Sequence, residues 1–321
     1  MRASLPAIAA KGHQSLRMDA PEPQLLAVGA DANRRRIAYR WKAGEGPALL
    51  WLSGFLSDMT STKSAAVAEW AAAEGLAMMR FDYSGHGLSG GDLLDATIGD
   101  WLEESIAVWQ LMGEGPRIVI GSSMGGWIAL LLARHLAQQS RPRDLAGLVL
   151  IAPAFDMTEM LMWRALPQAS KDEDARTGVT YVPSAYADPY PITKHLIDEG
   201  RSHLLEGQPF DPGCPVRILQ GMRDLDVPWR LSLALVDLLA GADVELTLIK
   251  DGDHRLSAPH DLQRLTATIA TLSGSPGQSS SNSLQSPSDT PRSFPAPPGG
   301  RPTYRRGGIG HRSFRQGILR R

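Results

Sequence analysis

The sequence has little cysteine, no long apolar run and almost no net charge, and each of these excludes a class of protein. Cys214 is alone among 321 residues, so an intramolecular disulfide and a cysteine-based metal cluster cannot form. No stretch approaches the roughly 18 uninterrupted apolar residues that a membrane span needs, so we expect no stable membrane insertion. The formal net charge of −1 provides no electrostatic reason to expect binding to nucleic acid or to an anionic membrane.

The two ends of the chain differ in composition from its middle. The N-terminus has basic residues and no acid before Asp19, so residues 1–22 weakly resemble a mitochondrial presequence. We predict a flexible N-terminus on a cytoplasmic protein, with a mitochondrial location as the alternative if the protein is eukaryotic; Met18 is a second possible start. Residues 273–321 are rich in Ser, Pro, Gly and Arg, with a single acid, and are predicted to form a disordered basic tail.

Between these ends, residues 23–272 show short apolar runs that alternate with segments of helical periodicity. Most of the runs are continuously apolar, which is typical of parallel strands covered on both faces. Strands that alternate with helices predict an α/β protein with a doubly wound, mostly parallel sheet. The expected strands are residues 36–41, 48–52, 76–81, 117–120, 145–152, 216–221 and 244–250, and the expected helices are residues 62–75, 98–112, 124–139, 228–241 and 258–272.

This alternation stops between about residues 155 and 212. The segment has helical pieces separated by loops that contain Pro and Tyr, and the sheet pattern resumes at residue 216. Such an insertion after one strand predicts a helical cap over the carboxyl edge of the sheet. Open α/β sheets bind their ligands at that edge.

Residues 121–125 read GSSMG and match the pattern G-x-S-x-G, with Ser123 at the centre, after an expected strand and before an expected helix. In such a turn the serine is held in an unfavourable backbone conformation, so Gly121 and Gly125 must lack side chains. The helix that begins there directs its N–H groups toward the serine oxygen. In this context the pattern predicts a nucleophilic serine, and a plain tight turn is the alternative.

A serine nucleophile needs a base, and the base needs a carboxylate to orient it. The strand after the insertion ends in GMRDLDVP, with Asp224 and Asp226, and the next strand ends in KDGDHRL, with His254. All of these groups then lie at strand ends on one edge of the sheet, in the chain order Ser–Asp–His of α/β-hydrolases. We therefore predict an α/β-hydrolase fold, with Ser123 as the nucleophile and His254 as the base.

Two carboxylates compete for the orienting role. The spacing G-x-x-D-x-x-V-P selects Asp224, whereas Asp226 is expected to be solvated or to cap the following helix. Asp251 and Asp253 flank His254, but neighbours in sequence lack the geometry to hold its ring, and we expect them to stabilise a turn.

The oxyanion of the reaction needs two N–H donors. One is predicted to be the backbone N–H of Met124, directly after the nucleophile, and the other that of Phe55, in the loop SGFLSDM that follows an expected strand. Gly54 lets this loop turn close to the serine. A second loop, RFDYSGHGLSGG, contains Asp82 and His86, to which we assign structural roles at the edge of the site.

Five segments together carry a resemblance to a known family: LSGFLSDMTSTK, RFDYSGHGLSGG, GSSMGGW, GMRDLDVPW and DGDHRL. From about Ala48 to about Leu272, the chain resembles the branch of the α/β-hydrolases that contains the mitochondrial palmitoyl-protein thioesterase, which also hydrolyses mycophenolic acid acyl-glucuronide. The longer segments SGFLSDM and FDYSGHG narrow the resemblance to this branch. It implies the nucleophile at Ser123, the acid at Asp224 and the base at His254.

The resemblance also implies a reaction, which is hydrolysis of an acyl thioester or ester through an acyl-enzyme, with no cofactor and no metal. The implied substrates include S-acylated proteins. A carboxylesterase or peptidase of the same fold is the alternative, because the same triad serves all of these reactions. The methionine-rich stretch of the cap, residues 157–163, is interpreted either as the lining of an adaptable acyl-chain channel or as a packed cap helix.

Overall fold

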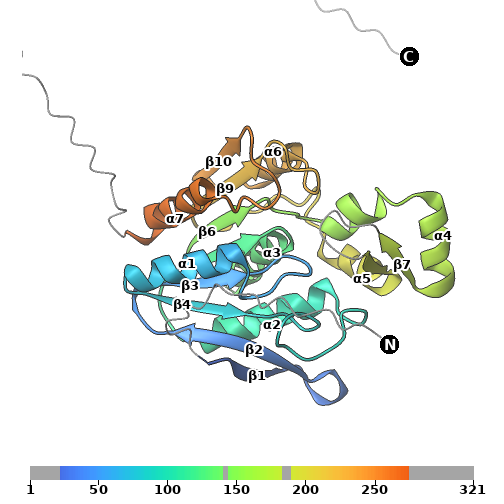
Figure 1. Ribbon diagram of the computed structural model, residues 1–321, viewed down its shortest axis with the longest axis horizontal. Coiled ribbons are helices and arrows are strands. Elements are labelled where there is room, and N and C mark those ends of the chain that lie inside the picture. The colour runs from blue at the N-terminus through green and yellow to red at the C-terminus, as the bar shows by residue number, and fades with distance from the viewer. Residues whose placement is uncertain (1–21, 140–143, 183–188, 275–321) are drawn as a thin grey trace, which may run out of the picture. The chain divides into compact units, whose positions relative to one another are not determined.

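The computed structural model of the chain describes residues 22–139, 144–182 and 189–274. The predicted flexible N-terminus and basic tail lie almost entirely outside these residues. An eight-stranded sheet forms the centre, in the order β1-β2-β4-β3-β5-β6-β9-β10 (Figure 1). Its strands are β1 (Gln24–Val28), β2 (Arg35–Lys42), β3 (Glu45–Leu52), β4 (Leu76–Phe81), β5 (Arg117–Ser122), β6 (Leu145–Ile151), β9 (Val216–Gly221) and β10 (Val244–Ile249).

The predicted doubly wound, mostly parallel sheet is confirmed. The pairs β1–β2 and β2–β4 are antiparallel, and the other neighbouring strands are parallel. Each of the five expected helices forms. They are α1 (Thr62–Ala73), α2 (Ile98–Leu111), α3 (Met124–Gln138), α6 (Trp229–Leu238) and α7 (Pro259–Ser273).

These helices cover both faces of the sheet. Along β5, Ile118 and Ile120 pack in one core cluster with residues of α1 and α7, whereas Val119 packs in another with residues of α2, α3 and α6. Successive side chains of a strand point to opposite faces, so a strand covered on both sides is apolar throughout. The continuous apolar run of β5 therefore follows from its place between two helical layers. Among the helices of the described residues, none is long and apolar enough to cross a membrane.

Three strands are absent from the sequence-based prediction: β1 and the hairpin of β7 (Val179–Val182) and β8 (Tyr190–Thr193). β1 pairs only with β2 at the edge of the sheet, and its Leu25 is 58% exposed. A short edge strand does not need a buried apolar run, so its sequence lacks the signal by which the inner strands are predicted.

Between β6 and β9 the chain leaves the sheet, and the predicted cap lies in this segment (Figure 1). Asp156 accepts hydrogen bonds from the N–H groups of Leu205 and Glu206, both at 2.8 Å, which joins the start of the segment to its end. Met157 and Met162 are buried in the main core cluster, which favours the packed helix over the acyl-chain channel. The elements of this segment are η3 (Thr158–Trp163), α4 (Gln168–Thr177), the β7–β8 hairpin, α5 (Lys194–Gly200) and η4 (Arg201–His203).

Candidate active site

Ser123 lies at the turn from β5 into α3, with φ 55° and ψ −119°. A positive φ is unfavourable for a residue that has a Cβ, so the turn is strained. Three hydrogen bonds hold it. The Ser123 N–H donates to the C=O of Ile151 at 2.8 Å, and its C=O accepts from Gly126 and Ala154 at 2.9 and 3.0 Å. The backbone of Ser123 is therefore fixed at the carboxyl end of β5.

The two glycines of the pattern make room for this turn. A Cβ on Gly121 would collide with the C=O of Gly125, and a Cβ on Gly125 would collide with the backbone oxygens of Leu52 and Ser53 at the end of β3. The sequence G-x-S-x-G thus reflects two close approaches of backbone to backbone, one on each side of the serine.

Replacing Gly125 by alanine is expected to lower the free energy of unfolding by about 1–3 kcal/mol, because the added methyl group meets backbone that is held in the sheet. Thermal unfolding followed by circular dichroism measures the change. Gly90→Ala is the matched control, because a Cβ there would lie no closer than 3.7 Å to its nearest neighbours. The control is expected to change stability by less than about 0.5 kcal/mol. Equal stability of Gly125→Ala and wild type would contradict the packing described here.

The loop of residues 53–59 follows β3 and lies against the serine. A Cβ on Gly54 would lie 3.3 Å from the Ser123 Cβ and 3.9 Å from its Oγ, so the loop backbone packs closely against the serine and a side chain there would crowd it. The next residue, Phe55, is the predicted oxyanion donor. Met124, the other predicted donor, is the first residue of α3 and is fully buried. Met124 is thus next to Ser123 in sequence, and Phe55 directly follows the glycine that lies against Ser123.

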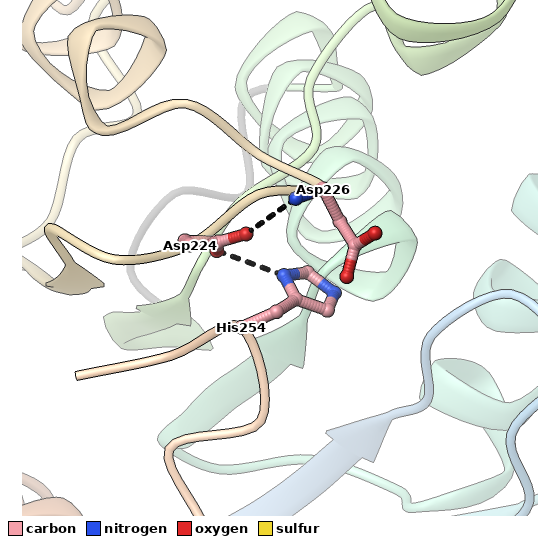
Figure 2. Close-up of side chains that lie close together, drawn as sticks. All are labelled: Asp224, Asp226 and His254. Atoms are coloured by element: carbon pink, nitrogen blue, oxygen red, sulfur yellow. Dashed lines mark hydrogen bonds and ion pairs between the residues drawn. The ribbon is translucent and has the colours of Figure 1, made fainter. Parts of the chain in front are cut away.

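Asp224 and His254 are brought together by the loops that follow β9 and β10 (Figure 2). The Asp224 Oδ2 atom lies 2.8 Å from the His254 Nδ1 atom and accepts a second bond from Gln220 at 3.1 Å. Its Oδ1 atom accepts from the N–H groups of Asp226 and Val227 at 2.9 and 2.8 Å. The Asp224 side chain is fully buried, and four donors satisfy its charge.

The bond to Asp224 also fixes the tautomer of His254. A carboxylate oxygen only accepts, so Nδ1 carries the proton and Nε2 is left as the acceptor. The hydrogen bonds among the described residues do not include one between Ser123 and His254. In substrate-free enzymes the bond between nucleophile and base is often long. The two residues nevertheless belong to the same sheet edge, because β5, β9 and β10 run parallel with β6 between the first two.

Asp226 follows one of the two alternatives predicted for it, because its side chain is exposed to solvent. The N-cap of α6 is Pro228, so the interpretation of Asp226 as a helix cap is wrong. One carboxylate oxygen of Asp226 lies near the His254 ring and Asp224. This oxygen, a ring nitrogen of His254 and an oxygen of Asp224 all lie within 4.8 Å of one another (Figure 2). Three such ligands can hold a metal ion, but both Asp224 oxygens already accept two N–H bonds each, which favours a hydrogen-bonding role for the cluster.

The loop that carries His254 is fixed on both sides of the ring. Asp253 accepts the N–H of Leu256 at 2.9 Å, which is the turn-stabilising role predicted for it. Lys63, at the start of α1, donates to the C=O of Arg255, and burial lowers its pKa to about 8. Sequence reasoning missed Lys63, because no local pattern relates α1 to a loop that is 192 residues away.

Comparison with known proteins shows the family of this chain. Residues 48–187 match the family model described as serine aminopeptidase, S33. The mitochondrial palmitoyl-protein thioesterase ABHD10 of Bos taurus is 37% identical over 238 residues, which cover 74% of this chain and 76% of the relative. The chain belongs to the ABHD10 family of α/β-hydrolases. It is a hydrolase, and the resemblance described from the sequence segments is confirmed.

Two solved structures support the same family. A putative hydrolase from Agrobacterium vitis S4 is 43% identical with a TM-score of 0.76, and α/β-hydrolase domain-containing protein 10 from mouse is 35% identical with a TM-score of 0.68. Each comparison covers 78% of this chain and 98% of the solved chain. The shared fold therefore extends over nearly the whole of both relatives.

In this member of the ABHD10 family, the cap reaches the site through Tyr190 of β8. The Tyr190 ring packs edge-on against the ring of Phe55, with the centroids 6.0 Å apart. Burial raises the pKa of Tyr190, and the negative charge of Asp226 raises it further, so the tyrosine stays neutral. The sequence gives no signal for this contact, because it depends on how the cap folds back over the 53–59 loop.

Proposed function

We propose that this hydrolase cleaves acyl thioesters or esters with Ser123 as the nucleophile, His254 as the base and Asp224 as the carboxylate that orients the base. The observation that carries the proposal is the hydrogen bond from His254 to the buried Asp224, at the sheet edge where Ser123 occupies a strained turn. The names of the mammalian relatives add S-acylated proteins to the proposed substrates.

In the proposed reaction, the His254 Nε2 atom takes the proton of the Ser123 hydroxyl as the oxygen attacks the acyl carbonyl carbon. The carbonyl oxygen becomes negative and accepts hydrogen bonds from the backbone N–H groups of Phe55 and Met124. The bond to sulfur or oxygen breaks, and the leaving thiol or alcohol takes the proton from His254. Water then attacks the acyl-enzyme with His254 again as base, which releases the acid and restores Ser123.

The strained backbone conformation of Ser123 positions its hydroxyl for this reaction. A serine at an N-cap usually turns its hydroxyl toward the N–H groups of the first helical turn, whereas Ser123 has a positive φ and makes no such capping bond. The start of α3 then contributes both the Met124 N–H and the positive end of the helix dipole to the oxygen that becomes negative.

The proposal is tested by comparing S-acyl cysteine peptides with p-nitrophenyl esters of the same acyl groups, from butyryl to palmitoyl. We expect kcat/KM to be higher for the thioester than for the oxygen ester at the longer chain lengths. Faster turnover of short oxygen esters would favour the carboxylesterase alternative, and release of amino acids from peptides would favour the peptidase alternative that the family model's description suggests. A protein that hydrolyses none of these substrates would overturn the proposal.

We further propose a cytoplasmic location, with mitochondria as the alternative. The mammalian relatives are named as mitochondrial proteins, which supports the alternative. Fractionation of the native cells, with an antibody against the chain, distinguishes the two compartments.

A further inference from the structure

His86 is 5% exposed and uses both ring nitrogens in hydrogen bonds. Its Nε2 atom lies 3.0 Å from the backbone nitrogen of Leu56, and since an N–H only donates, Nε2 accepts. Its Nδ1 atom lies 3.0 Å from the C=O of Ser84, which only accepts, so Nδ1 carries the proton. The two partners select one neutral tautomer, and burial favours the neutral ring further by lowering the pKa of His86.

Leu56 has a backbone conformation that needs such a partner. Its φ is 57°, in the left-handed region that residues with a side chain avoid. The Ser57 N–H donates to the C=O of Gly54 at 3.1 Å, which closes a β-turn with Leu56 at the position where type II turns favour glycine. A leucine remains in this conformation only where its surroundings hold it there.

The strained residue directly follows Phe55, the proposed oxyanion donor. Peptide units are planar, so a bond that fixes the peptide between Phe55 and Leu56 limits how far the Phe55 backbone can rotate. The Phe55 ring also packs edge-on against the His86 ring, with the centroids 6.1 Å apart. The backbone and the side chain of the donor residue therefore both depend on the same histidine.

The loop that carries His86 is anchored in turn. Trp101 of α2 donates from Nε1 to the same Ser84 C=O that His86 uses, at 3.2 Å. Asp82 is buried and accepts the N–H of Met59 at 2.7 Å, which joins this loop to the 53–59 loop at a second point. These bonds fix the loop that carries His86, and with it the position of the ring beside Leu56.

We propose that His86 is a positioning residue of the reaction. Its Nε2 atom accepts the Leu56 N–H and keeps the strained turn in place, so that the Phe55 N–H is directed at the oxygen that becomes negative when Ser123 attacks. The inference rests on the proposed function. His86 neither contacts the acyl group nor takes a proton, which separates this role from that of a general base.

The test compares His86→Phe, which keeps a buried ring without an acceptor, with His86→Gln, whose amide oxygen can take the place of Nε2. The negative oxygen forms only after the substrate has bound, as Ser123 attacks. Loss of the Phe55 hydrogen bond to this oxygen therefore lowers kcat more than it changes KM. For His86→Phe we expect kcat to fall about 100-fold, with KM within about threefold of wild type. For His86→Gln we expect kcat within about tenfold of wild type.

A second variant separates positioning from packing. Glycine adopts a positive φ without support, so Leu56→Gly introduced into His86→Phe is expected to restore kcat at least about tenfold. A histidine that only filled space would give no such rescue, because Leu56→Gly does not refill the space. If His86→Phe does not fold, His86→Asn takes its place, since the shorter amide does not reach Leu56, and the same loss is expected.

The outcomes distinguish this role from the proposed function. Two results would overturn the positioning role alone, provided that the wild-type protein hydrolyses the acyl substrates. One is an unchanged kcat in the folded His86 variants, and the other is a loss of kcat that Leu56→Gly does not rescue. A wild-type protein that hydrolyses none of them overturns the proposed function and the positioning role with it. A selective loss of kcat in His86→Phe that is avoided in His86→Gln and is recovered by Leu56→Gly supports the role.

Discussion

Replacing Ser123 by alanine is expected to lower kcat for acyl ester hydrolysis by about 10⁶-fold, because the nucleophile, the base and the carboxylate act as one unit. A residual rate of about 10³-fold or more above that in water is expected from the oxyanion donors and from substrate binding alone. Alanine keeps the Cβ and with it the strain of the turn, so the free energy of unfolding is expected to change by less than about 0.5 kcal/mol. Steady-state kinetics with a p-nitrophenyl ester and labelling with a fluorophosphonate measure the loss.

Ser122→Ala is the matched control for this variant. Ser122 is the last residue of β5 and carries the neighbouring hydroxyl, but its backbone belongs to the sheet and pairs with Ile151 of β6. The control is expected to react with the fluorophosphonate at the wild-type rate. Labelling of Ser123→Ala at that rate would show that another residue is the nucleophile.

The sequence predicts the inner strands and two of the proposed triad positions for the same physical reason. Strands buried on both faces must be continuously apolar, so their ends can be located, and parallel strands bring their carboxyl ends to one edge. Ser123 and Asp224 each follow such an end, whereas His254 follows the edge strand β10, which is only partly buried. The order of the strands brings Asp224 and His254 to the same edge, and the short loop after β9 decides which carboxylate bonds to the ring. The edge strand β1 lacks this signal because water covers part of it.

The contacts that support the site do not follow from a pattern in the sequence. His86 and Leu56 are 30 residues apart and meet through one backbone N–H, which any residue other than proline supplies. Tyr190 reaches Phe55 only because the cap hairpin folds over the sheet edge. The position of Asp226 beside the imidazole depends on the path of one short loop, so local spacing does not predict it.

Asp224 and Asp226 both lie near the His254 imidazole, and replacing each in turn tests which of them orients it. Asp224→Asn is expected to lower kcat by about 10⁴-fold, because an amide nitrogen can face Nδ1 and select the tautomer in which Nε2 carries the proton and no longer acts as a base. Asp226→Asn has the same change of charge on an exposed side chain and is expected to lower kcat by less than about tenfold.

The buried amide of Asp224→Asn must replace four accepted hydrogen bonds, so a loss of about 1–3 kcal/mol in unfolding free energy is expected as well. Kinetics are therefore measured well below the unfolding temperature of each variant, with circular dichroism as the check of folding. Loss of activity in folded Asp224→Asn with activity retained in Asp226→Asn assigns the orienting role to Asp224. The reverse result would assign it to Asp226, because its carboxylate is the other one within reach of the His254 ring.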